Sequence, residues 1–167
     1  NASAKSLTRI DLTFSPNSNN NNVIIVWNNS GVFTNPTGIP PSIGSSFAGG
    51  TLLYNGTSSP IIHSGLTAGT PYYYKAFSYD GYSYSTGLTS SATTFTQFTL
   101  NLTALIEGFY DVNSNTMISD TITVELRNMT SPFSLVELKK IVLNTSGSGS
   151  ANFTTLIDGT PYYLVLK

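Results

Sequence analysis

The feature that most constrains this chain is a motif that occurs twice with the same internal spacing. Residues 66–73 and 156–163 both read Leu-x-x-Gly-Thr-Pro-Tyr-Tyr, 90 residues apart. The glycine permits a bend, and the proline fixes φ for the segment that follows. In an antiparallel sandwich, a tyrosine just after such a crossing can hydrogen-bond back to the loop backbone, an arrangement called a tyrosine corner. The repeat therefore predicts two sandwich-type units, each latched at one corner.

Each copy of the motif supplies three residues with a structural role at the corner. The leucine fills the core, the glycine bends the chain, and the first tyrosine forms the latch. These residues are Leu66, Gly69 and Tyr72 in the first copy and Leu156, Gly159 and Tyr162 in the second.

Apolar periodicity predicts strands along most of the chain. Ile10, Leu12 and Phe14 alternate with polar residues, which is typical of a half-buried strand. Residues 23–27 are apolar on both faces, so they predict a central strand with Trp27 in or near the core. After Thr94 the alternation restarts with a long strand from Phe98 to Ile106. We therefore place a domain boundary near residue 95.

Turn residues predict how several strands connect. Asn55-Gly56 and Asp80-Gly81 each indicate a tight hairpin turn, and the Gly/Ser-rich stretch 144–153 indicates a third. Residues 134–143 are ambiguous, because Ser134 and Glu137 resemble a helix capping box while the apolar pattern suits a strand. We favour the strand.

Composition excludes several classes of function. Only 9% of the residues are charged, against roughly 25% in an ordinary soluble domain, and the net charge is −1. This charge composition gives no reason to expect binding to nucleic acid or to an anionic membrane. The chain has no cysteine, which excludes disulfides and thiolate metal sites. No apolar run is long enough to cross a bilayer. A neutral surface suits contacts with carbohydrate or protein.

The first half resembles a fibronectin type III domain in several segments. These are IDLTF, VIIVW, GLTAGTPYYYKAFSYD and YSYSTGLTSSATT, with GGTLLYNGTS as the hairpin common in such domains of large secreted bacterial surface proteins. The second half, through DTITVELRN and LNTSGSGSANFTTLIDGTPYYLVLK, resembles the Ig-like or prealbumin-like stalk domains that follow them. The resemblances imply an all-β chain of two tandem Ig-like antiparallel β-sandwiches, residues 1–94 and 95–167.

In the stalk family, another strand follows the segment that corresponds to YYLVLK. We therefore expect the second sandwich to lack a final strand, as a window on a longer polypeptide or as a subunit whose edge a neighbour completes. An unpaired edge strand is an association site, because its open N–H and C=O groups template another chain.

A dense set of aromatic residues lies between positions 72 and 84. Alternation sends Tyr72 and Tyr74 inward and leaves Tyr73, Phe77 and Tyr79 on the opposite face. There they are candidate ligand-binding residues that can stack on sugars. Ordinary cross-strand pairing is the alternative, and we favour it.

Other chemically capable residues have simpler explanations. His63 is the only histidine, and Ser64 beside it points to the opposite face of a strand, so we expect no catalytic site. The series Asp111, Asn113 and Asn115 resembles the start of a calcium loop but lacks its later ligands, so we expect a polar hairpin tip. Asp120-Thr121-Ile122 resembles a bacterial O-glycosylation site at Thr121.

Together these features predict a non-catalytic structural or adhesive module of a bacterial surface or secreted assembly. We expect an extracellular location, no cofactor and no metal. The expected partners are protein, through self-association or neighbouring modules, and glycans. The alternative function is a carbohydrate-binding accessory module of a secreted hydrolase.

Overall fold

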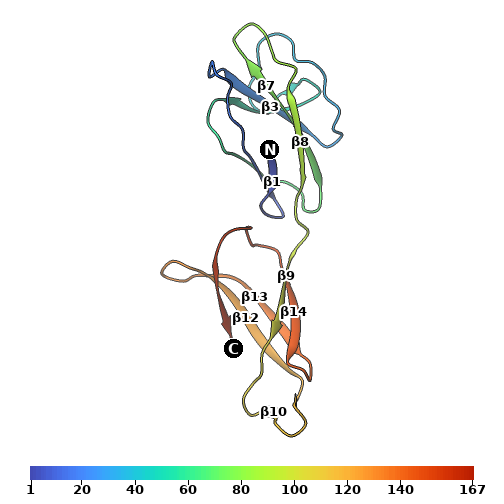
Figure 1. Ribbon diagram of the computed structural model, residues 1–167, viewed down its shortest axis with the longest axis vertical. Helices are drawn as coiled ribbons and strands as arrows, with labels where there is room; N and C mark the ends of the chain where they lie inside the picture. The colour runs from blue at the N-terminus through green and yellow to red at the C-terminus, as the bar shows by residue number, and fades with distance from the viewer. The chain divides into compact units, whose positions relative to one another are not determined.

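The computed structural model describes all of residues 1–167, and its regular structure consists entirely of β-strands. Every strand pair is antiparallel. The expected all-β class is therefore confirmed. The chain divides into two compact units, Asn1–Phe95 and Thr96–Lys167, whose strands can be followed in Figure 1.

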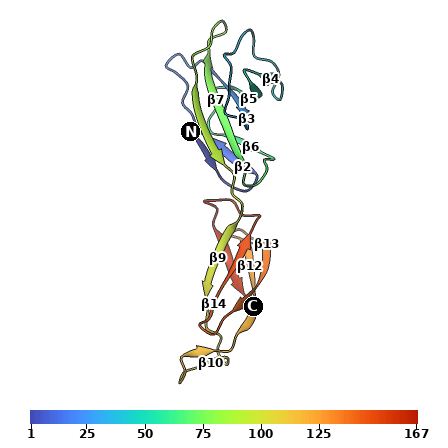
Figure 2. The same cartoon turned by 90° about the vertical axis from the view of Figure 1, so that its right-hand side faces the viewer.

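The first unit contains two sheets. One has the strand order β4-β5-β3-β7-β8, and the other has the order β1-β2-β6 (Figure 2). Its strands are β1 (Ala2–Ala4), β2 (Arg9–Leu12), β3 (Asn22–Asn28), β4 (Ser46–Phe47), β5 (Gly50–Gly56), β6 (Ile61–Ser64), β7 (Pro71–Tyr79) and β8 (Leu88–Thr93). β3 pairs with β5 on one side and β7 on the other, which confirms the predicted central strand.

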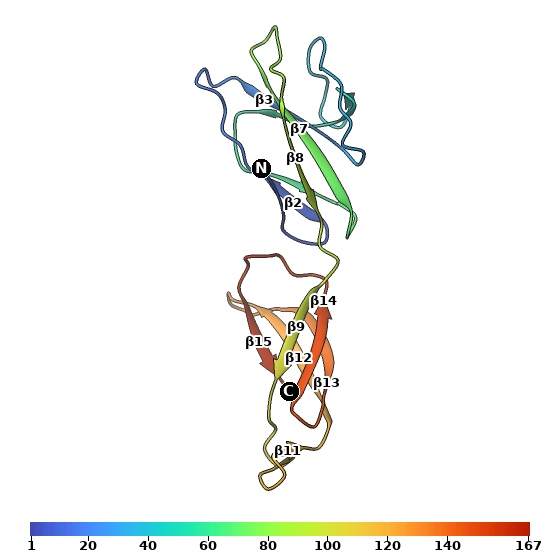
Figure 3. The same ribbon diagram turned by 45° about the vertical axis from the view of Figure 1, so that its right-hand side comes forward.

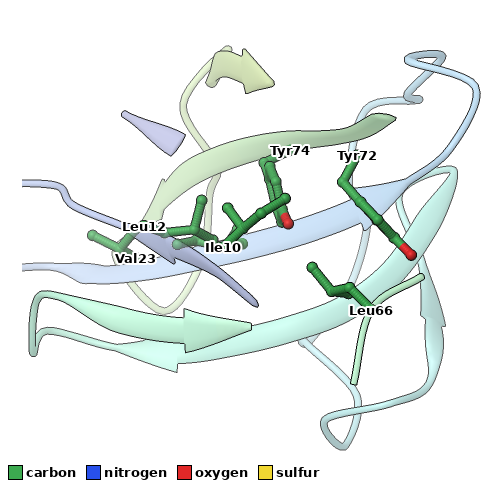
Figure 4. Close-up of a cluster of buried hydrophobic side chains, with 7 residues drawn as sticks. Ile10, Leu12, Val23, Leu66, Tyr72 and Tyr74 are labelled. Atoms are coloured by element: carbon green, nitrogen blue, oxygen red, sulfur yellow. The ribbon is translucent and has the colours of Figure 1, made fainter. Parts of the chain in front are cut away.

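The core of this unit lies between its two sheets. Alternation along β2, β3 and β7 turns every second side chain into the space between them. The buried members are Ile10, Leu12, Val23, Ile25, Leu66, Tyr72 and Tyr74 (Figure 4). Trp27 packs against this cluster from a half-buried position, as predicted.

The predicted hairpin at Asn55-Gly56 is wrong. Neither residue takes the positive φ that a tight hairpin turn requires. Both instead belong to β5 and pair with β3, and the chain then crosses to β6, which pairs with β2. The turn at Asp80-Gly81 is confirmed, because Gly81 has φ of 100° and the Asp80 carboxylate accepts hydrogen bonds from the backbone N–H groups of Tyr82 and Ser83.

The outer face of the five-stranded sheet is also covered. The long segment 29–49 between β3 and β5 folds over it and contributes Phe33, Phe47 and Ala48. Beneath them lies a second buried cluster, formed by Ile24, Val26, Leu52 and Phe77. The central strands of this sheet are therefore buried on both sides, which explains why residues 23–27 are continuously apolar.

The second unit contains two facing sheets and a small hairpin. The sheet orders are β13-β12-β15 and β14-β9, and β10 pairs with β11 (Figure 3). Its strands are β9 (Phe98–Thr103), β10 (Tyr110–Asp111), β11 (Thr116–Met117), β12 (Asp120–Asn128), β13 (Leu135–Leu143), β14 (Ser148–Phe153) and β15 (Tyr162–Leu166). Residues 135–143 are a strand, so the favoured reading of that segment is confirmed.

The core of the second unit lies between these sheets. Its buried members are Met117, Ile122, Val124, Leu126, Ile141, Leu143 and Phe153. The β9 strand ends at Thr103, shorter than predicted, yet Ala104 and Ile106 still pack against the core. The Gly/Ser turn forms at Gly147, but β14 pairs with β9 and not with β13. This turn is therefore a crossing between sheets, not the predicted hairpin.

Candidate functional site

The first corner holds its tyrosine in the predicted geometry. Gly69 has φ of 63°, and the backbone N–H of Thr67 donates a hydrogen bond of 2.9 Å to Tyr72 Oη. Leu66 is buried in the core beside Tyr72 (Figure 4). The phenol thus satisfies a loop N–H group that would otherwise lose its partner on burial.

The second corner repeats this arrangement with less burial. Gly159 has φ of 76°, and the backbone N–H of Ile157 donates a hydrogen bond of 3.2 Å to Tyr162 Oη. Leu156 and Tyr162 are each half-buried. The motif therefore makes the same local hydrogen bond in both units, while the packing around that bond differs.

His63 lies inside the first unit and is only 7% exposed. Its Nδ1 lies 3.0 Å from Tyr74 Oη, and its ring centroid lies 4.8 Å from that of Trp27. Burial lowers the pKa of His63 to about 4, so the imidazole is neutral near pH 7. Ser64 is exposed on the opposite face of β6. The structure therefore does not bring the two residues together in the way that a hydrolytic pair requires.

The outward aromatic residues do not form the exposed patch that alternation suggests. Phe77 is only 1% exposed, so its assignment as a ligand-binding residue is wrong. The physical reason is that Tyr84 and Gly87 lie against its ring and the segment 29–49 packs on the same cluster, which the pattern of β7 cannot reveal. Tyr79 is half-buried and stacks on Tyr84 with ring centroids 4.4 Å apart. Tyr73 is also half-buried and lies against Gly31.

One aromatic ring near this face remains free. Tyr82, at the tip of the hairpin between β7 and β8, is 97% exposed. Beside it lies a hollow of about 420 Å³, and its lining is mostly small or polar: Asn35, Pro36, Thr37, Gly38, Tyr82, Ser83, Tyr84, Ser85 and Thr86. Tyr84 Oη donates a hydrogen bond of 2.9 Å to the Gly38 carbonyl, which joins the two walls. Sequence reasoning missed this hollow because its walls lie more than 40 residues apart along the chain.

The calcium-like series forms the predicted polar hairpin tip between β10 and β11. The Asp111 carboxylate accepts hydrogen bonds from the backbone N–H of Asn113 and the hydroxyl of Ser114, which lower its pKa. No group of three or more acidic or imidazole side chains is placed to hold a metal ion. Thr121 is exposed on β12, with its N–H donating to the Asp120 carboxylate.

Carboxylates of the second unit are held by close partners. Glu125 pairs with Arg127 and with Lys167, and each oxygen–nitrogen distance is 2.7 Å. Burial raises the pKa of Glu137, but hydrogen bonds from Thr154, Thr155 and Lys139 outweigh that effect and lower it to about 2. Five of the ten charged side chains in residues 96–167 take part in these ion pairs and in the pair of Glu137 with Lys139.

The outer strand β15 exposes apolar side chains. Tyr163 is 46% exposed, and Leu164 and Leu166 are each 43% exposed. β15 has one strand neighbour, β12, and no neighbour on its other side. Exposed apolar side chains and open backbone groups therefore coincide along this edge.

The structure contains no helix able to cross a bilayer. A scan against family models, a search of curated proteins and a search of solved structures each found no match for this chain.

Proposed function

We propose that this chain is a non-catalytic structural and adhesive module pair of an extracellular bacterial assembly, serving as a stalk, fibre or filament subunit. The first unit is the fibronectin type III-like module, and the second is the Ig-like stalk module. Antiparallel sheets packed over apolar cores support a mechanical role, because they hold their shape without disulfides. The low fraction of charged residues supports close contact with neighbouring modules.

The observation that carries this proposal is that the side chain best suited to catalysis, that of His63, is packed in the core. His63 is the only imidazole, and it lies among Trp27, Tyr72 and Tyr74. Its hydrogen bond goes to a phenol, and its lowered pKa keeps it uncharged. Such a group stabilises a core and offers no proton-transfer route to an external substrate.

The location can be tested on cells of the source organism. We expect antibodies raised against the purified chain to label intact, unpermeabilised cells or to detect the chain in the medium. Mild protease treatment of intact cells should remove the cell-bound signal, while a cytoplasmic marker protein survives. Labelling that occurs only after permeabilisation would contradict an extracellular role.

A second candidate function is carbohydrate binding, and the free ring of Tyr82 is the observation that favours it. An exposed aromatic ring beside a hollow lined by hydroxyl and amide groups suits stacking on a sugar. In this second candidate function the ligand would bind at the hairpin tip, and Phe77 would take no part in binding.

Binding to polysaccharides can separate the two functions. If the second candidate holds, the chain binds at least one polysaccharide on a glycan array, and Tyr82→Ala removes that binding. Ile62→Ala is the matched control, because Ile62 is also exposed but lies on β6. Binding that survives Tyr82→Ala, or no binding to any glycan, would leave the structural function alone.

A further inference from the structure

The outer face of the five-stranded sheet carries a second hollow, further along β8 than the hollow beside Tyr82. Its volume is about 430 Å³, and it is lined by hydroxyl groups and aromatic rings: Ser30, Gly31, Phe33, Tyr73, Tyr74, Thr89, Ser90 and Ser91. Alternation along β8 turns Thr89 and Ser91 to this outer face, and both are exposed. The second hollow therefore offers the same kinds of group as the first.

The two hollows are bounded by the same two parts of the chain. One wall is the segment that covers the sheet, through residues 30–33 at one hollow and 35–38 at the other. The opposite wall is the hairpin tip 82–86 at the first hollow and β8 at the second. The hollows thus follow one another along the line where the covering segment ends and β8 begins.

The separation of the hollows sets the size of a ligand that fills both. Tyr73 lies at the second hollow, and Tyr79 pairs with Tyr84 at the first. These two positions on β7 are about 20 Å apart, since an extended strand rises about 3.3 Å per residue. Only an elongated molecule can occupy both hollows at once.

Lys75 lies between the two hollows. Its partner in the register of β7 with β8 is Thr89, which lines the second hollow. On its other side, a Cβ added at Gly87 would lie 2.9 Å from Lys75 Cε, and Thr86 next to that glycine lines the first hollow. The ammonium group lies 5.1 Å from the centroid of the Phe77 ring. The lysine therefore covers Phe77 and brings a positive charge to the middle of the groove.

The charge of Lys75 is not used within the chain. None of the ion pairs of the molecule includes Lys75, whereas Arg9 of the same unit is paired with Asp11. Covering Phe77 needs only the aliphatic part of the lysine, so packing does not explain the ammonium group. A half-buried cation between two hydroxyl-lined hollows favours a ligand with a negative charge at that point.

We propose that the two hollows and Lys75 form one groove for a linear polysaccharide with spaced uronic acids, whose carboxylate binds Lys75 while the neighbouring sugars lie in the hollows. The inference rests on the second candidate function and names its ligand class. Tyr82 and Tyr73 supply aromatic rings at the two ends of the groove, on which sugar rings can stack. The serine and threonine hydroxyls of the walls can both donate to and accept from sugar hydroxyls.

Asp80 explains why the charges of the ligand must be spaced. Its carboxylate accepts hydrogen bonds from the backbone N–H groups of Tyr82 and Ser83, which lower its pKa and keep it charged near pH 7. A second anion of the ligand at the hairpin tip would be repelled by this carboxylate. One cation with one anion near the end of the groove therefore fits single carboxylates separated by uncharged sugars, and disfavours a densely sulfated chain.

An NMR titration of the complete chain tests the proposal. The probes are hexasaccharides of hyaluronan, heparosan and gellan, each compared with its uncharged, carboxyl-reduced form. We expect at least one acidic probe to shift the amide signals of residues that line both hollows. Its reduced form should bind about tenfold more weakly, because it loses the charge-assisted contact with Lys75. Glucuronate alone should bind more weakly than the hexasaccharide, since it cannot reach both hollows.

Substitution of Lys75 isolates the charge. Lys75→Met keeps the apolar cover of Phe77, so the fold should survive while the affinity for the acidic probe falls about tenfold. The affinity of this variant for the reduced probe should not change. Lys75→Arg keeps the charge and should bind like the unmodified chain. Lys140→Met is the matched control, because it removes an exposed cation from β13 in the second unit.

A variant of the second hollow tests its part separately. Ser91 is exposed on β8, so Ser91→Glu leaves the core intact and places a carboxylate where the acidic ligand should lie. We expect a several-fold loss of affinity for the acidic hexasaccharide, and no loss for its reduced form. Ser64→Glu is the matched control, since Ser64 is exposed on β6 of the other sheet.

Three results would overturn the proposal: no binding of any acidic probe, binding that is unchanged in Lys75→Met, and tighter binding of heparin than of unsulfated heparosan. Binding of neutral glycans that needs Tyr82 but not Lys75 would reject this groove and leave the second candidate function standing. Absence of binding to every glycan, neutral or acidic, would reject both.

Discussion

Tyr74 and Leu164 follow their corner tyrosines at the same distance, yet one is 2% exposed and the other 43%. Both corners contain the hydrogen bond from the loop N–H to the phenol. The difference arises beyond the corner, because β7 lies between β3 and β8 while β15 borders only β12. The comparison teaches that the motif determines the local bend, whereas distant strands determine how much of the following strand is buried.

The largest effect should come from truncating the two equivalent side chains. Tyr74→Ala should lower the free energy of unfolding of the first unit by about 3–5 kcal/mol, because it leaves a cavity and removes the partner of His63. Leu164→Ala should cost the second unit less than about 1 kcal/mol, since solvent already reaches Leu164. Urea titration followed by fluorescence reports the first unit alone, because Trp27 is the only tryptophan.

Circular dichroism over the same titration follows both units and serves as the control measurement. Equal losses of stability in the two variants would contradict the comparison. They would mean that burial beneath β8 does not make Tyr74 contribute more to stability than Leu164 does.

As the pH falls, the first unit should begin to lose stability at a higher pH than the second unit. The folded-state pKa of His63 is about 4, below its ordinary value of 6.5. Above pH 6.5 the imidazole is neutral in both states and has no effect. Between pH 6.5 and 4 only the unfolded chain binds the proton, so the unit loses up to about 3 kcal/mol. In the second unit, the pKa of Glu137 is lowered from 4.5 to about 2, so its contribution is lost only below pH 4.5.

The urea midpoint of the Trp27 signal, measured from pH 7 to pH 4, checks this order. The midpoint is preferred to the signal intensity because protonated His63 can quench the nearby indole. A His63→Phe variant should be less stable at pH 7 but should lose this part of the pH dependence. A midpoint that stays constant from pH 6.5 to 4 in the unmodified chain would be inconsistent with a buried neutral imidazole.

The smallest effect should come from the latches themselves. Tyr72→Phe leaves the Thr67 N–H without its partner at a part-buried site and should cost about 1–3 kcal/mol. Tyr162→Phe should cost less than about 1 kcal/mol, because water can reach the exposed Ile157 N–H. Thermal unfolding of both variants gives the comparison. A larger loss of stability in Tyr162→Phe than in Tyr72→Phe would contradict the expected order.

The sequence predicted the features that depend on neighbouring residues. The corner bends need Gly69 and Gly159, and the alternation of Ile10 and Leu12 places both in the core. The prediction from sequence failed where contacts with segments far along the chain determine the local structure. Asn55-Gly56 has the composition of a hairpin turn, but pairing with β3 keeps it extended.

The same limit applies to the candidate sites. Phe77 follows the alternation of an exposed residue, but Tyr84, Gly87 and the segment 29–49 cover this face of the sheet. The hollow beside Tyr82 has walls from two distant loops, so no local pattern marks it. By contrast, the sequence correctly predicted that Ser64 lies on the opposite face of β6 from His63. That relation follows from strand geometry alone.

Native-state hydrogen exchange of two backbone amides tests the central difference most directly. The Tyr74 amide points toward β8 and should be protected to nearly the full stability of the first unit. The Leu164 amide points away from β12 and should exchange at a rate close to that of an open chain. Equal and strong protection of both amides would contradict the account, because β15 would then already have a partner on its outer side.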